Sequence, residues 1–230
     1  MNKRFSGKNI LVAGGTGGLG RAVSLAFLDE GAMVFVTYRN QAEFDALKNS
    51  AGANAPLEGQ SVNVLDENEL KAFVSKQDRV DALVNAVGGY TAGAPLWEMD
   101  SKALDQMLSL NLKAGYLLAR TVVPLMLKQG SGTIVNVAAT AAFNHMASAS
   151  EYVASKAAAV AMIASLAADL KGSGVRANSI LPSIIDTEAN RKAMPDADHT
   201  KWPKPEEIAR VILFLCSEDA KLVHGAAIPV

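Results

Sequence analysis

The sequence of 230 residues contains little cysteine, little excess charge and no clustered metal ligands. Cys216 is the only cysteine, so no internal disulfide can form, which is typical of a reducing compartment. The 22 Lys and Arg residues nearly balance 23 Asp and Glu residues, so the chain offers no polybasic surface for nucleic acid or an anionic membrane. No Cys/His cluster has metal-ligand spacing. These absences predict a cytoplasmic protein with no metal, nucleic-acid partner or membrane association.

Long apolar runs are missing too. The longest, 157–168, is interrupted by Ser165 and is shorter than the roughly 18 residues that cross a bilayer. The polar stretch 1–9 leads into a glycine-rich turn and not into the apolar segment of a signal peptide. Half of the residues are nevertheless hydrophobic, which excludes a disordered chain. No repeat, charge block or linker divides the sequence, so we expect one domain over 1–230.

Short runs rich in β-branched residues alternate with stretches of helical spacing. The strand-like runs are apolar on both faces, as are parallel strands covered by helices on both sides. The sequence therefore predicts an α/β fold of Rossmann type, a doubly wound parallel sheet of about seven strands flanked by helices on both faces. The predicted strands lie near 9–13, 33–38, 60–64, 80–85, 132–137, 175–181 and 224–229, and the helices near 17–30, 41–50, 66–76, 99–128, 151–172 and 205–217.

A glycine-rich turn follows the first predicted strand. Glycines let the backbone approach a pyrophosphate, and the next helix supplies N–H donors and a partial positive charge at its N-terminus. Such glycines can also form a plain tight turn, but a place between the first strand and the first helix favours a dinucleotide site. The absence of a G-x-x-x-x-G-K-[ST] string disfavours a P-loop nucleotidase. The turn reads Ala13-Gly14-Gly15-Thr16-Gly17-Gly18-Leu19-Gly20.

The spacing Gly14-x-x-x-Gly18-x-Gly20 resembles the T-G-x-x-x-G-x-G turn of the short-chain dehydrogenases/reductases, with Ala13 at the threonine. Four further strings resemble family motifs in the same order and cover essentially the whole chain. This resemblance implies an oxidoreductase that uses NAD(H) or NADP(H). The strings are Asn85-Ala86-Val87-Gly88 for N-N-A-G, Asn111 for the active-site Asn, Tyr152-x-x-x-Lys156 for Y-x-x-x-K, and Pro182-Ser183-x-x-x-Thr187 for P-G-x-x-x-T.

Tyr152 and Lys156 are one helical turn apart and therefore face the same way. A phenol has an ordinary pKa near 10, and a neighbouring ammonium favours the phenolate, so we expect Lys156 to lower the pKa of Tyr152. In the resemblance, Tyr152 protonates the product and Lys156 also holds the ribose. Asn111 would hold a water that links Lys156 to solvent.

The second predicted strand ends without the carboxylate that NAD sites usually place on the ribose 2′-OH. Arg39 stands there instead. It either pairs with a 2′-phosphate, helped by Thr16 and Asn40, or is an exposed loop arginine. We favour NADP(H) over NAD(H), with Asn63 expected to end the third strand and contact the adenine. The other cofactor residues implied by the resemblance are Gly14, Gly18, Leu19, Gly20, Val64, Asn85, Ala86, Val87, Tyr152, Lys156, Pro182, Ile185 and Thr187.

The main departure from the family is Ala139, which stands thirteen residues before Tyr152 where a serine normally holds the substrate carbonyl. Thr140 either substitutes for that hydroxyl or points elsewhere. The dihydropteridine reductase branch of the family also has alanine there. The stretch 88–93 and the segment 186–202 resemble that branch, which implies a substrate lid near 187–204. Candidate walls of the substrate pocket are Tyr90, His145, Met146, Met194 and Trp202.

The sequence thus predicts a reductase that transfers hydride from NADPH to a small carbonyl or conjugated quinonoid acceptor, a dihydropteridine-like compound among them. The alternative is a non-catalytic NADP(H)-binding regulatory protein that lost the active-site serine. Retention of Tyr152, Lys156 and Asn111 favours the enzyme, since a binding protein needs no proton relay. By resemblance, the helices over 101–128 and 152–172 pair across the interface of a homodimer or homotetramer.

Overall fold

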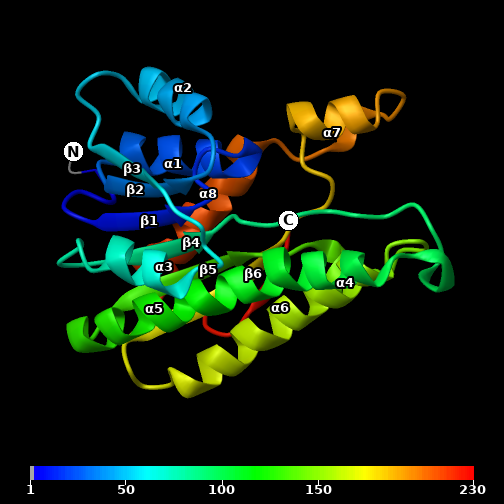
Figure 1. Cartoon of the computed structure of the whole chain (residues 1–230). Helices are drawn as coiled ribbons and strands as arrows, with labels where there is room; N and C mark the ends of the chain where they lie inside the picture. Colours follow the sequence, from blue (N-terminus) through cyan, green and yellow to red (C-terminus); the bar gives the residue numbers. More distant parts are fainter. Residues whose placement is uncertain (1–2) are drawn as a thin grey trace.

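The computed structural model describes residues 3–230, and its central element is a seven-stranded sheet with helices on both faces (Figure 1). All neighbouring strands run parallel, in the order β3-β2-β1-β4-β5-β6-β7. The predicted α/β fold of Rossmann type is therefore confirmed. The strands are β1 (Asn9–Ala13), β2 (Met33–Tyr38), β3 (Leu57–Ser61), β4 (Ala82–Asn85), β5 (Gly132–Val137), β6 (Val175–Leu181) and β7 (Ala227–Pro229).

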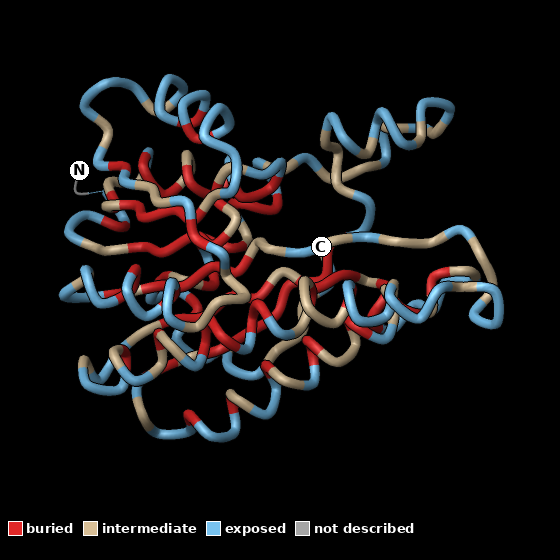
Figure 2. Tube along the Cα trace, in the orientation of Figure 1, coloured by how far each residue is buried: buried red, intermediate tan, exposed pale blue. Residues whose placement is uncertain are grey.

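The two larger hydrophobic cores lie on opposite faces of this sheet, because successive strand residues point to alternate sides. On one face Ile10 and Val12 of β1 pack under α1 (Gly18–Asp29), α2 (Gln41–Ala51) and α8 (Pro205–Cys216). On the other face Leu11 packs under α3 (Glu67–Val74), α5 (Ala114–Gln129) and α6 (Ser150–Asp169). The strands form the buried layer in Figure 2.

Helix α6 is, within residues 3–230, the one helix long and apolar enough to cross a membrane by length and composition. The interrupted apolar run 157–168 did not predict this. The helix packs against β6 and the second core through Ile163 and Ala167. Core helices of a sheet pass the same test, so the finding is weak evidence of a membrane span.

Several boundaries differ from the sequence prediction. β3 covers Leu57–Ser61 and not 60–64, because it is an edge strand whose polar Glu58 and Gln60 hide its apolar signal. Asn63 therefore lies beyond the strand. The predicted helix 99–128 is divided into α4 (Ser101–Leu108) and α5 by a π-helical turn, Ser109–Lys113. A short helix, α7 (Glu188–Ala193), was not predicted.

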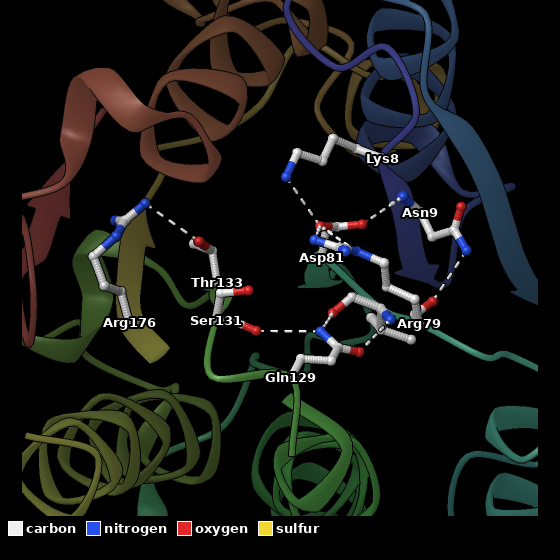
Figure 3. A network of polar contacts seen from close by, with 9 residues as sticks. Lys8, Asn9, Arg79, Asp81, Gln129, Ser131, Thr133 and Arg176 are labelled. Atoms are coloured by element: carbon white, nitrogen blue, oxygen red, sulfur yellow. Dashed lines mark hydrogen bonds and ion pairs between the residues drawn. The ribbon is translucent and has the colours of Figure 1, made fainter. Parts of the chain in front are cut away.

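The amino-terminal edge of the sheet is closed by a polar network (Figure 3). The carboxylate of Asp81, before β4, accepts hydrogen bonds from the Arg79 guanidinium (2.6 and 2.8 Å), Lys8 Nζ (3.2 Å) and the Asn9 N–H (2.9 Å). Arg176 of β6 donates to Thr133 Oγ1 at 3.2 Å. A cavity of about 480 Å³ opens beside this network, and no predicted site residue lines it. The network therefore joins strands at the edge away from the predicted site.

Asp81→Asn is expected to lower the free energy of unfolding by about 2 kcal/mol at pH 7, the usual contribution of hydrogen bonds to a charged group. Burial alone would raise the pKa of the Asp81 carboxyl, but hydrogen bonds from Arg79, Asn9 and Lys8 outweigh it and hold the pKa below its ordinary value. A lowered folded-state pKa stabilises the fold above the unfolded-state pKa and loses that effect as the pH falls.

Urea unfolding of the two proteins at pH 7 and at about pH 3 measures this. The difference between them should shrink at the lower pH. Asp169→Asn, at the exposed end of α6, is the control and should change stability by less than about 0.5 kcal/mol. Equal stability of Asp81→Asn and wild type at pH 7 would contradict the expectation.

Candidate active site

The turn between β1 and α1 folds so tightly that Gly15 and Gly20 have no space for a side chain. Gly14 has a φ of +72°, a left-handed conformation that favours glycine. A Cβ on Gly20 would lie 2.1 Å from the Gly14 carbonyl oxygen, and one on Gly15 would lie 2.5 Å from Val36 Cγ1. The glycines thus let the start of α1 lie directly on the ends of β1 and β2.

The N-terminus of α1 remains free to bind an anion. Its N-cap is Gly17, no side chain caps it, and its first turn has no acidic residue. The first N–H groups of a helix have no intrahelical partner and carry the positive end of the helix dipole. The glycine cradle and this uncapped helix therefore fit the pyrophosphate of a dinucleotide, as the sequence predicted for Gly14, Gly18, Leu19 and Gly20.

Tyr152, Lys156 and Asn111 meet at the carboxyl-terminal edge of the sheet. Lys156 is buried, its Nζ donates to the Val137 carbonyl at the end of β5 (3.2 Å), and it lies 5.9 Å from the centre of the Tyr152 ring. A Cβ on Gly88 would lie 2.9 Å from Asn111 Oδ1 and 3.2 Å from Lys156 Nζ. The loop after β4 therefore approaches both side chains closely because residue 88 is glycine.

Asn111 lies in the π-helical turn, and its side chain bonds to the loop after β4 and to α6. Its Oδ1 accepts from the Gly89 N–H (2.8 Å), and its Nδ2 donates to the Gly89 carbonyl (3.0 Å) and to Ser155 Oγ (2.9 Å). Ser155 in turn donates to the Tyr152 carbonyl at 2.8 Å. Ser155 was not among the predicted site residues, although its place between Tyr152 and Lys156 could have identified it.

The expected lowering of the Tyr152 pKa is wrong for the protein alone. Burial, and to a smaller extent the electrostatic effect of Tyr90, raise the pKa of Tyr152 to about 12. Burial also lowers the pKa of Lys156 to about 8. Spacing alone predicted the wrong direction because Lys156 is buried, which disfavours its own charged form.

Tyr90 is the predicted wall residue that the structure places against Tyr152. Their ring centres are 4.9 Å apart with an angle of 79° between the planes, an edge-to-face contact. Tyr90 is 61% exposed, so its ring reaches from solvent to the half-buried Tyr152. His145 and Met146 are exposed on the loop before α6.

Ala139 lies buried just after β5. The neighbouring Thr140 is fixed through its backbone, whose N–H donates to the Pro182 carbonyl (3.0 Å) and whose carbonyl accepts from Phe143 and Asn144. Within residues 3–230 the Thr140 hydroxyl forms no hydrogen bond with Tyr152. The site therefore has one phenol at its centre and no hydroxyl from position 139.

Two of the three residues expected around a 2′-phosphate already form hydrogen bonds within the protein. Arg39 is exposed after β2 and forms no ion pair with any residue in 3–230. Asn40 accepts from the Ala42 N–H and caps α2 (3.0 Å), while Thr16 Oγ1 donates to Glu43 Oε2 (2.9 Å). Glu43 was missed by the sequence analysis, because its position on α2 does not reveal a contact with the glycine turn.

The loop after β4 touches the glycine turn. A Cβ on Gly14 would lie 3.2 Å from Val87 Cγ2, and the Val87 N–H donates to Asn85 Oδ1. Asn85 Nδ2 also donates to Asn136 Oδ1 (2.8 Å). Ala86 stands between Asn85 and Val87 in the chain. Farther along the edge, Asn63 Oδ1 accepts from the Leu65 N–H, and Val64 is partly buried. These predicted residues follow the ends of β3 and β4.

The segment after β6 returns to the same turn. Thr187 caps α7 and lies close to Gly18, where an added Cβ would be 2.8 Å from Thr187 Cγ2. No residue in 183–204 is buried, whereas Pro182 is. Trp202 packs on His199, whose Nε2 lies 2.8 Å from the Met194 carbonyl oxygen. The two predicted wall residues Met194 and Trp202 thus contact their own segment, and Ile185 packs against the first core.

Comparisons with known proteins agree with this geometry. Residues 8–198 match the family model described as short chain dehydrogenase. The chain is similar to 3-oxoacyl-[acyl-carrier-protein] reductase FabG of Thermotoga maritima, with 34% identity over 98% of this chain and 96% of the relative. The 7alpha-hydroxysteroid dehydrogenase of Escherichia coli is 30% identical, over 100% and 94%. The crystal structure of levodione reductase has 26% identity and a TM-score of 0.91, over 99% and 97%.

Proposed function

Since the chain belongs to the short-chain dehydrogenase/reductase family of oxidoreductases, we propose that it reduces a small carbonyl or conjugated quinonoid acceptor with NADPH. The observation that carries the proposal is the meeting of Tyr152, Lys156 and Asn111 beside the uncapped start of α1. A nicotinamide cofactor bound there supplies the hydride. The turn Gly14–Gly20, with Leu19, would hold its pyrophosphate, and Asn85–Val87, Pro182, Ile185 and Thr187 would line its other half.

The proton chemistry belongs to this chain's own residues. Tyr152, with a pKa of about 12, carries its proton at neutral pH and would give it to the acceptor oxygen or nitrogen. Lys156, with a pKa of about 8, exchanges its own proton near neutrality and would also donate to ribose hydroxyls. Asn111, fixed by Gly89 and Ser155, would orient a water that connects Lys156 to solvent.

The alanine at position 139 favours a conjugated acceptor over a plain ketone. A planar conjugated acceptor delocalises its developing charge and needs less stabilisation from a local donor than a plain ketone. A quinonoid dihydropterin is one such compound. The contact of Thr187 with Gly18 supports a role of the segment 187–204 as the substrate lid of one domain over 1–230.

Oxidation of NADPH, followed by absorbance with a panel of acceptors, tests the function. The panel holds quinones, diketones and quinonoid dihydropterin, with an oxoacyl thioester and a steroid ketone because the relatives' names indicate such substrates. We expect turnover of at least one conjugated acceptor. Tight binding of NADPH without turnover of any acceptor would instead support the non-catalytic regulatory protein.

Arg39→Ala tests the preference for NADPH. Loss of a charge-assisted contact with the 2′-phosphate should raise the Kd for NADPH by about 30-fold, equivalent to about 2 kcal/mol, and leave the Kd for NADH within about twofold. Fluorescence titration measures both. Lys48→Ala, which removes an exposed cation from the end of α2, is the control. A preference for NADPH that survives Arg39→Ala would remove the role of this arginine.

We also propose a homodimer or homotetramer through α4, α5 and α6. Leu104 and Leu127 are exposed on these helices, and a hollow of about 490 Å³ lies between Leu112 and Met162. Exposed apolar side chains next to a hollow are typical of a protein interface. Light scattering after size exclusion should give two or four times the chain mass of 24.1 kDa. A mass of one chain would contradict this assembly.

A further inference from the structure

A second phenol stands next to Tyr152. Tyr90 follows Gly88 and Gly89 on the loop after β4, and its ring meets the Tyr152 ring edge-to-face at 4.9 Å between centres. The loop is fixed on both sides of Tyr90. Both backbone groups of Gly89 bond to the Asn111 side chain, and the Gly93 N–H donates to the Ser148 carbonyl at 2.9 Å. Tyr90 is therefore held relative to the residues of the proposed proton relay.

At position 139, where the family usually has a serine hydroxyl, this chain has no side-chain hydrogen-bond donor. Ala139 presents only a methyl group, and the Thr140 hydroxyl has no hydrogen bond to Tyr152 within residues 3–230. Without another donor, Tyr152 alone would support the negative charge that develops on the acceptor atom. One missing donor at such an atom typically lowers kcat by about 100-fold or more.

We propose that the hydroxyl of Tyr90 is a second hydrogen-bond donor to the acceptor atom of the substrate and replaces the hydroxyl that is missing at Ala139. Tyr90 is then a further catalytic residue, and its role rests on the proposed reductase function. The hydride that NADPH supplies forms the new C–H bond of a carbonyl acceptor, or a new N–H or O–H bond of a quinonoid one. The Tyr152 O–H bond breaks to give the other new O–H or N–H bond, and the Tyr90 O–H bond stays intact.

Two observations support a donor and not only a wall. The edge-to-face contact, with 4.9 Å between the ring centres, keeps Tyr90 beside the phenol that would protonate the acceptor. Tyr90 is also 61% exposed, so its hydroxyl is accessible to a substrate. A phenol is neutral at pH 7 and can donate there.

Tyr90→Phe keeps the ring and its contact with Tyr152 and removes only the hydroxyl. With the acceptor that wild type turns over, we expect kcat to fall about 100-fold, KM to stay within threefold and the Kd for NADPH to remain unchanged. Tyr116→Phe, an exposed tyrosine on α5, is the matched control and should keep the wild-type kcat.

Ala139→Ser supplies the second readout. In the Tyr90→Phe background it should restore kcat at least tenfold, while in wild type it should change kcat less than threefold. A wild-type kcat in Tyr90→Phe, a loss confined to KM, or no rescue by Ala139→Ser would overturn the donor role alone. Wild type without turnover of any acceptor would overturn the reductase function itself and this role with it.

Discussion

Tyr152→Phe should lower the rate of hydride transfer by about 1000-fold and leave the Kd for NADPH within about threefold. The variant keeps the ring that Tyr90 contacts and loses only the hydroxyl that protonates the product. A positioned general acid contributes about 100- to 10,000-fold to a rate. The remaining hydroxyl, that of Tyr90, would not replace it, because the proposed role of Tyr90 leaves its O–H bond intact.

Single-turnover stopped flow separates this chemical step from product release. Wild type, Tyr152→Phe and the Tyr116→Phe control are mixed with NADPH and the acceptor, and the loss of NADPH absorbance is followed. Unfolding in urea confirms that the variants are folded. A Tyr152→Phe rate within tenfold of wild type would exclude Tyr152 as the proton donor.

Gly20→Ala should raise the Kd for NADPH at least about 100-fold. Its Cβ would lie 2.1 Å from the Gly14 carbonyl oxygen, and a backbone atom of a tight turn cannot move away as a flexible side chain can. The start of α1 must therefore shift, which displaces the N–H groups that would bind the pyrophosphate. Overpacking of this kind also destabilises a fold by about 1–3 kcal/mol.

Gly17→Ala is the matched control, since its Cβ would meet only the Gly14 carbonyl oxygen at the ordinary distance of 3.6 Å. Its Kd should stay within about tenfold of wild type. Circular dichroism and urea unfolding distinguish loss of binding from loss of folding. Wild-type affinity in Gly20→Ala would show that the turn does not hold the cofactor.

Most of the sheet could be predicted because its central strands are apolar on both faces. Runs such as Ile134-Val135 leave little choice between a buried parallel strand and another element. The edge strand β3 was misplaced by three residues because only one face of an edge strand with Glu58 and Gln60 carries an apolar signal. The short α7 lies in a segment without buried residues, so no periodic pattern marks it.

The candidate site was predicted in its residues but not in its electrostatics. Spacing shows that Tyr152 and Lys156 share a helix face, and the structure adds that Lys156 is buried and Tyr152 half-buried. Burial penalises the charged form of each group, which reverses the expected direction of the Tyr152 pKa. Depth below the surface depends on the loops over the helix, and a single sequence does not place these loops.

Contacts between segments that are far apart in the sequence could not be predicted either. The bond from Thr16 to Glu43 and the bond from Asn111 to Ser155 join residues on different elements, 27 and 44 positions apart. Each residue taken alone looks like an ordinary polar side chain of a loop or helix. Glu43 matters because it places a carboxylate near Thr16, one of the residues that would assist Arg39.

Transfer of deuterium from NADPH tests the central claim most directly. NADPH labelled with deuterium at either face of nicotinamide C4 is incubated with wild type and the acceptor that it turns over, and the NADP+ formed is analysed by mass spectrometry. We predict that NADP+ loses the deuterium of one of the two labelled cofactors and keeps that of the other, because hydride leaves from one face only. Partial loss of deuterium from both, or bound NADPH that is never oxidised with any acceptor, would contradict hydride transfer in this site.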